Sequence, residues 1–174
     1  MARQGRTAAR PIALAAIVIL AALPAIASAG NDLGHKAGSN ATVTFNHSLL
    51  EANAHDAVHY NDDNSIEPTD ISTTNYHETA GMEVNVYDYA YGDTGWYGRW
   101  YCRSWSGSVC LEGVVQINLS YGPYTATEMR SLMCEEVGHS VGLAHSSETA
   151  SCMSQRWDRT LLTAHDKGIL NARY

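Results

Sequence analysis

Residues 134–145, with the sequence CEEVGHSVGLAH, decide how the rest of the chain is interpreted. Glu135 and His139 are four residues apart, so on a helix their side chains project from the same face. Gly142 follows, and a residue without a Cβ can turn the backbone sharply at positive φ. Such a turn can return His145 to the same point. Three potential ligands can therefore meet one metal ion.

Two helices are expected in this half of the chain. Thr125 and Glu128 form a capping box, and apolar residues recur every fourth position from 129 to 141, as on one face of a helix. A last helix is predicted to begin near Thr163, with Asp166 three residues later. The metal ligands at 135 and 139 are thus predicted to lie on the first of these helices.

The N-terminal half is predicted to alternate strands with a helix. A capping box at Ser48 and Glu51 predicts a helix that runs to about Tyr60. Period-two alternation predicts strands at residues 41–45, 82–89 and 113–120. Residues 61–74 are expected to be a polar loop, and residues 92–110, rich in Gly, Trp and Tyr, a further strand and a long connection.

The stretch resembles the metzincin motif H-E-x-x-H-x-x-G-x-x-H. Four residues are in register with it: Glu136, His139, Gly142 and His145. Glu135 stands where the family has its first histidine. Met153 lies eight residues after the last histidine, the spacing at which matrixin-type members place the methionine of their Met-turn. No tyrosine stands two residues beyond Met153, so a tyrosine ligand of the astacin-like kind is not expected.

The resemblance implies an α+β fold: a twisted, mostly parallel sheet with two helices behind it, a cleft along an edge strand, the Met-turn and a C-terminal helix. It also implies a zinc endopeptidase acting on polypeptides. Glu135, His139 and His145 would hold one zinc ion, and Glu136 would be the general base. Met153 would form the floor beneath the metal.

Glu135 leaves two functions open. Zinc accepts a carboxylate oxygen at about the same distance as an imidazole nitrogen, and two histidines with one glutamate form a known catalytic ligand set. An anionic ligand leaves less positive charge on the ion, so the bound water is expected to be less acidic. The alternative is an inactive pseudopeptidase that binds peptides or proteins through the same cleft. Arg156 and Trp157 are expected near the wall of this cleft.

Residues 1–29 are interpreted as a secretory signal peptide, because basic residues precede an apolar run from Pro11 to Leu23, and Ala27-Ser28-Ala29 is an A-x-A cleavage signal. Residues 30–174 would then form one exported, metallopeptidase-like domain, expected to be monomeric and to have no stable membrane association. The chain carries a formal net charge of −7. This charge argues against nucleic acid as a partner.

The cysteines are expected to form disulfides, since an even number occurs in a chain predicted to be exported. Three pairings are possible. The sequence-local one is favoured, in which each bond closes a short loop: Cys102 with Cys110, and Cys134 with Cys152.

The remaining candidate ligands have simpler interpretations. His55 and His59 are also four residues apart, but no third ligand follows at a usable spacing, so the pair is interpreted as a surface feature. Four further histidines are interpreted as polar surface residues or as supports for other groups: His35, His47, His77 and His165. Residues 61–64, NDDN, offer calcium ligands without the pattern of an EF-hand, and a solvated turn is preferred.

Overall fold

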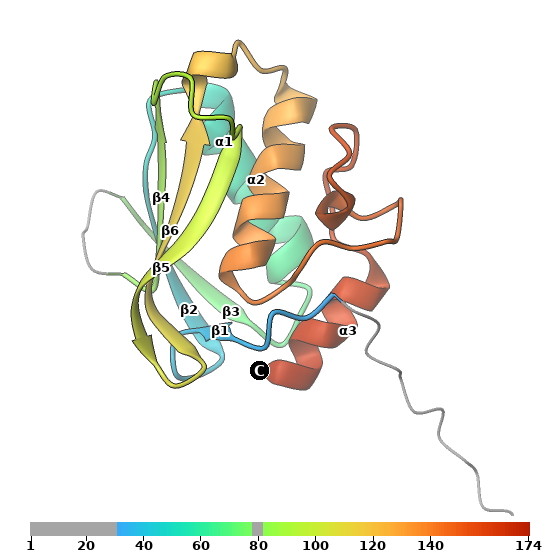
Figure 1. The fold of residues 1–174 in the computed structure, drawn as a ribbon. Coiled ribbons are helices and arrows are strands. Elements are labelled where there is room, and N and C mark those ends of the chain that lie inside the picture. Colours follow the sequence, from blue (N-terminus) through green and yellow to red (C-terminus); the bar gives the residue numbers. More distant parts are fainter. Residues whose placement is uncertain (1–30, 78–81) are drawn as a thin grey trace, which may run out of the picture.

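A computed structural model describes residues 31–77 and 82–174 (Figure 1). The predicted signal peptide therefore lies outside the described residues. In the described part of the chain, no helix is both long enough and apolar enough to cross a membrane.

Within residues 31–77 and 82–174, the core of the fold is one six-stranded, mostly parallel sheet. Its strands are β1 (Lys36–Ala37), β2 (Thr42–Ser48), β3 (Ser72–His77), β4 (Val84–Tyr89), β5 (Gly98–Ser106) and β6 (Val109–Asn118). The order is β1-β6-β4-β2-β3, and all of these neighbours are parallel. β5 pairs antiparallel with β6, from Gly98 opposite Ile117 to Ser106 opposite Val109. The sheet is thus parallel except for an antiparallel strand at one edge.

In the described residues, three α-helices accompany the sheet: α1 (Ala52–Asn61), α2 (Ala126–Ser140) and α3 (Ala164–Arg173). Shorter helical turns are η1 (Asp62–Ile66), η2 (Leu119–Tyr121) and η3 (Cys152–Ser154). Figure 1 shows α1 and α2 on one side of the sheet and α3 below them, near the C-terminus. Apolar side chains of β2, β4 and β6 meet those of α1 and α2 in one buried cluster.

The prediction for α2 is confirmed. Thr125 accepts a hydrogen bond from the backbone of Glu128, whose side chain bonds back to the backbone of Thr125. The predicted apolar stripe is buried: Met129, Leu132, Met133, Val137 and Val141. The capping box at Thr163 and Asp166 likewise begins α3. These elements could be predicted because their signals are local in the sequence.

The predicted start of α1 was wrong. Ser48 is the last residue of β2, and Glu51 precedes α1 without a capping hydrogen bond from its side chain. Asp88 of β4 instead holds the two residues that precede the helix. Its carboxylate accepts hydrogen bonds from the backbone N–H groups of Leu50, at 2.5 Å, and Glu51, at 2.9 Å. The segment before α1 is thus fixed by a neighbouring strand, which no local pattern could reveal.

The predicted loop at residues 61–74 was also wrong. It contains the last residue of α1, the π-helical turn η1 and the first residues of β3. Asn61 is buried and donates hydrogen bonds to the backbone oxygens of Ala57 and Arg130, both at 3.0 Å. Ile66 and Ile71 are buried in the core. The run at 61–64 is therefore helical and partly buried, not a solvated turn.

The two disulfide bonds follow the sequence-local pairing. Cys102–Cys110 joins β5 to β6, which are connected by a short turn at Gly107 rather than by the predicted long connection. We call this bond the hairpin disulfide. Cys134–Cys152, the helix–Met-turn disulfide, joins α2 to η3. The second bond attaches the segment containing Met153 to the helix that carries the proposed ligands.

Candidate metal centre

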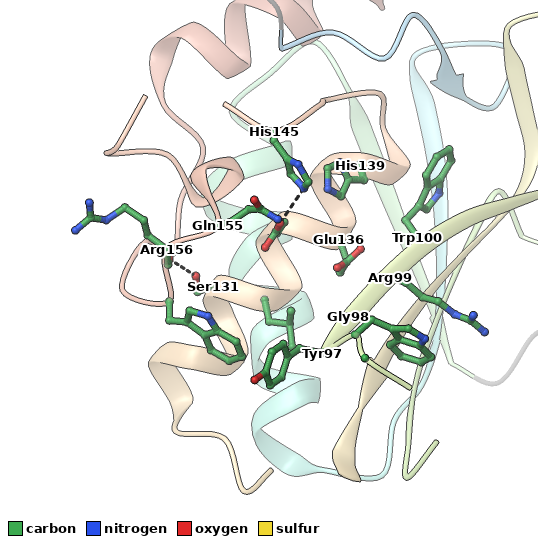
Figure 2. A pocket seen from close by; sticks show the side chains of 15 residues that line it. Tyr97, Gly98, Arg99, Trp100, Ser131, Glu136, His139, His145, Gln155 and Arg156 are labelled. Carbon is green, nitrogen blue, oxygen red and sulfur yellow. Dashed lines mark hydrogen bonds and ion pairs between the residues drawn. The ribbon is translucent and has the colours of Figure 1, made fainter. Parts of the chain in front are cut away.

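Three potential ligands meet at the C-terminal end of α2. Glu135 and His139 project from the helix and His145 from the loop that follows, and one ligand atom of each lies within 4.8 Å of the other two. We call this group the Glu-His-His site. Figure 2 shows His139, His145 and the neighbouring Glu136 around one end of a cavity.

The turn at Gly142 brings His145 to the helix. Gly142 has a φ of 112°, a conformation that L-residues rarely adopt. A Cβ there would also lie 2.1 Å from the backbone oxygen of His35. The backbone N–H of Leu143 donates to Gly138 at 2.9 Å and closes the end of the helix. Gly142 is thus required by both backbone conformation and space.

Both ends of the described chain hold this turn in place. The backbone of Asn31 accepts a hydrogen bond from Ala144, and Leu33 donates one to Gly142, both at 2.9 Å. From α3, the guanidinium of Arg173 donates to the backbone oxygens of Gly142, at 2.6 Å, and His35, at 2.5 Å. The position of His145 therefore depends on contacts distant in sequence.

His139 has the tautomer and the charge that a neutral metal ligand needs. Its Nδ1 lies 2.8 Å from the backbone oxygen of Leu143. Since that oxygen can only accept, Nδ1 carries the hydrogen and Nε2 keeps its lone pair. Burial lowers the pKa of His139 to about 4, with a smaller contribution from the nearby His145. At neutral pH the imidazole is uncharged, as metal binding requires.

Glu135 is held toward His145. Its Oε1 lies 3.1 Å from Nε2 of His145. Burial raises the pKa of Glu135, while His145 and a hydrogen bond from the side chain of Gln155 act in the opposite direction. Gln155 has a φ of 60°, uncommon for a residue other than glycine. It occupies the position two residues beyond Met153 and contributes to the cavity wall.

Glu136 points from α2 to the edge strand. Its side chain is buried, and a Cβ added to Gly98 at the start of β5 would lie 2.6 Å from its Oε1. Burial, and to a lesser degree the charge of Glu135, raises the pKa of Glu136 to about 8. A cation at the Glu-His-His site would oppose this shift because it favours the ionised carboxylate. Glu136 thus lies between the ligands and the edge strand.

Met153 lies beneath the helix that carries the site. It is fully buried, and a Cβ at Gly138 would lie 2.4 Å from its sulfur. Its backbone oxygen accepts a hydrogen bond from Ser146 at 2.8 Å. Ser151 donates to the buried carboxylate of Asp166 at 2.6 Å. The Met153 segment is thus fixed to the loop after His145 and to α3.

A cavity of about 590 Å³ adjoins the site. Its walls are residues 95–100, at and before the start of β5, the side of α2 that carries Glu135 and Glu136, the loop residue His145, and residues 155–157. Trp157 packs edge-on against Tyr97, with ring centroids 4.8 Å apart, and Ser131 of α2 donates to the backbone oxygen of Arg156 at 2.8 Å. Arg156 and Trp157 thus line the cavity, as the sequence predicted. The contribution of residues 95–100 to the cavity wall was not predicted, although their richness in Gly, Trp and Tyr was a sequence signal that could have indicated it.

Of the four histidines predicted to be polar surface residues or supports, two are buried, His165 is half-buried, and the side chain of His77 lies outside the described residues. His35 is buried and stacks on Trp100, with ring centroids 4.5 Å apart. His47 is also buried, and it lies against His55 and His59. The interpretation of that pair as a surface feature without a third ligand was therefore wrong. The folded chain provides the third histidine from β2, upstream of the pair rather than downstream.

Comparison with known proteins identifies a similar fold but no protein of similar sequence. No family model matches the chain, and no characterised protein matches its sequence. Among solved structures, that of myroilysin aligns with a TM-score of 0.58 and 13% sequence identity, covering 83% of this chain and 98% of that chain. With its mostly parallel sheet and three helices, the chain has a metzincin-like fold.

Proposed function

We propose that this chain is a secreted zinc-dependent endopeptidase of matrixin-like type. One observation carries the proposal: three convergent ligands lie beside a buried carboxylate, Glu136, which faces the edge strand. The donor set suits zinc, since two imidazoles and a carboxylate form a known catalytic combination. The tautomer of His139 leaves its Nε2 available to the ion.

The antiparallel strand β5 is proposed as the binding site for an extended polypeptide. Among the described strands it pairs only with β6, so its other edge can add a further strand through backbone hydrogen bonds. The cavity at the start of β5 would then receive a side chain of the substrate. Trp157 provides an aromatic wall there, and Arg156 a positive charge.

Glu136 is proposed as the general base. Bound zinc would polarise the scissile carbonyl and lower the pKa of a water molecule. Glu136 takes a proton from the attacking water and returns it to the departing amine, so that water is added across the C–N bond. Its buried position next to Gly98 keeps the carboxylate beside the edge strand. Glu135, His139 and His145 hold the ion.

The deciding experiment measures zinc content and peptide cleavage together in purified protein. The parent is expected to hold zinc at this site and to cleave unstructured polypeptides. Glu136→Gln should retain the metal and lose cleavage, because it removes a base but no ligand. Glu135→Ala should lose zinc affinity. A parent without zinc at this site and without cleavage would refute the proposal.

The second candidate is an inactive module that binds polypeptides through the same cleft. The ion pair between Glu135 and His145 favours it, because these side chains satisfy each other without a metal. Under this alternative, Glu135→His should create zinc binding and cleavage that the parent lacks. Under the first proposal the parent already has both.

Secretion is proposed from the N-terminal segment and the two disulfide bonds, which are typical of exported proteins. Expression of the full chain with mass spectrometry of the culture medium tests it. A product that begins at Gly30 is expected, and gel filtration should give the mass of a monomer. Product confined to the cell, with residues 1–29 attached, would contradict the proposal.

A further inference from the structure

Three histidines, one on β2 and two on α1, converge on one another. His47 is on β2, and His55 and His59 are on α1. One ring nitrogen from each lies within 4.8 Å of the other two. We call this group the three-histidine cluster. No residue of β2 or α1 is among the described residues that line the cavity beside Glu135.

The backbone explains why the rings meet. Val43, Phe45 and His47 alternate along β2, so they lie on the same face of the sheet, and the first two are in the core beneath the helices. His55 and His59 are four residues apart and lie on one face of α1. The ring centroid of His47 is 4.9 Å from that of His55 and 5.0 Å from that of His59.

We propose that the three-histidine cluster binds a second divalent transition-metal ion, with zinc as the probe. Neutral imidazole is a preferred ligand of zinc, copper and nickel. With metal–nitrogen distances of about 2.0–2.1 Å, tetrahedral ligands lie roughly 3.3 Å apart. The observed separations of up to 4.8 Å can close to this value through small side-chain rotations. His55 and His59 are half-buried, so the ion can be reached from solvent.

The ion would fasten α1 to the sheet. The side chain of the N-cap residue, Glu51, makes no capping hydrogen bond to α1, and Asp88 of β4 bonds only the backbone N–H groups of Leu50 and Glu51, before the helix. A metal shared by His47, His55 and His59 would join the middle and the last turn of the helix to β2. The role is structural and does not depend on the proposed peptidase activity.

Zinc stoichiometry tests the proposal with the whole mature chain. Chelator-treated protein is incubated with micromolar zinc, desalted and measured by elemental analysis. The parent is expected to bind two equivalents. Glu135→Ala combined with His139→Ala should bind one, and so should His55→Gln. His165→Ala, a half-buried histidine outside both groups, is the matched control and should bind two.

The two metal sites can fail independently. The parent could bind only one equivalent of zinc. If His55→Gln loses that equivalent and the double variant with Glu135→Ala and His139→Ala keeps it, the result would support the cluster and refute the Glu-His-His site. The proposal is overturned if the double variant with Glu135→Ala and His139→Ala binds no zinc although its near-ultraviolet circular dichroism shows that it is folded. It is also overturned if zinc raises the melting temperature of that protein no more than that of its His55→Gln derivative.

Discussion

Gly98→Ala tests the position of the proposed base, because it adds one methyl group where β5 approaches α2. The new Cβ would lie 2.6 Å from Oε1 and 2.7 Å from Cγ of Glu136, whereas ordinary contact begins at 3.4 Å. The carboxylate would have to move by roughly 0.8 Å. A misplacement of about 1 Å can cost about 100-fold in rate, so we expect kcat to fall by roughly 10- to 100-fold.

The assay for Gly98→Ala combines steady-state cleavage of an unstructured polypeptide with zinc analysis and urea unfolding. Zinc content should equal that of the parent, because no ligand is altered. The free energy of unfolding should fall by about 1–3 kcal/mol, as is usual for overpacking. The matched control is Gly168→Ala on α3, where nothing lies within 4 Å of the new Cβ. Parental kcat in Gly98→Ala, with zinc bound, would refute the placement of Glu136.

Three further predictions concern stability. Replacing both cysteines of the helix–Met-turn disulfide with alanine should lower the free energy of unfolding by about 3 kcal/mol, because the bond closes a separation of 18 residues. The same change at the hairpin disulfide, with a separation of 8 residues, should lower it by about 2.5 kcal/mol. Only the first change should weaken zinc binding in a zinc titration. Metal-free protein should lose stability as the pH rises from 6.5, the ordinary pKa of histidine, to 8. Folding raises the pKa of Glu136 to about 8, whereas the unfolded chain releases that proton at lower pH. The melting temperature of Glu136→Gln should depend less steeply on pH over this range. Asp166→Ala should lower the free energy of unfolding by about 3 kcal/mol in urea titrations, since it removes the buried acceptor for Ser151 and Asn31, and a change below 1 kcal/mol would contradict this.

The predictions succeeded where the signal was local. The helix α2 has its cap, its apolar stripe and the pair Glu135 and His139 within residues 125–141, so the sequence alone indicated both the helix and two potential ligands. Gly142 indicated the turn that brings the third potential ligand, His145, back to the helix. These features depend on helical geometry and on the conformational freedom of one glycine, which act over short distances.

The predictions failed where a residue obtains its role from a partner distant in sequence. β3, with the sequence STTNYH, has no apolar alternation, and it is a strand because its backbone pairs with β2. Asp88 fixes the two residues before α1, which precede it by almost forty positions. His47 joins His55 and His59 only because β2 lies beneath α1. A pattern search forward from residue 59 could not find it.

The hydrogen bonds that hold the turn at Gly142 bear on when the site forms during folding. Arg173 reaches His35 across 138 residues of sequence, and Asn31 reaches Asp166 across 135. Contacts of such long range are slow to form, because a large loop must close before they add any stability. The helix α2 can form early, yet His145 takes its position only after both ends of the described chain have docked. A refolding experiment should therefore recover helical circular dichroism before high-affinity zinc binding at Glu135 and His139.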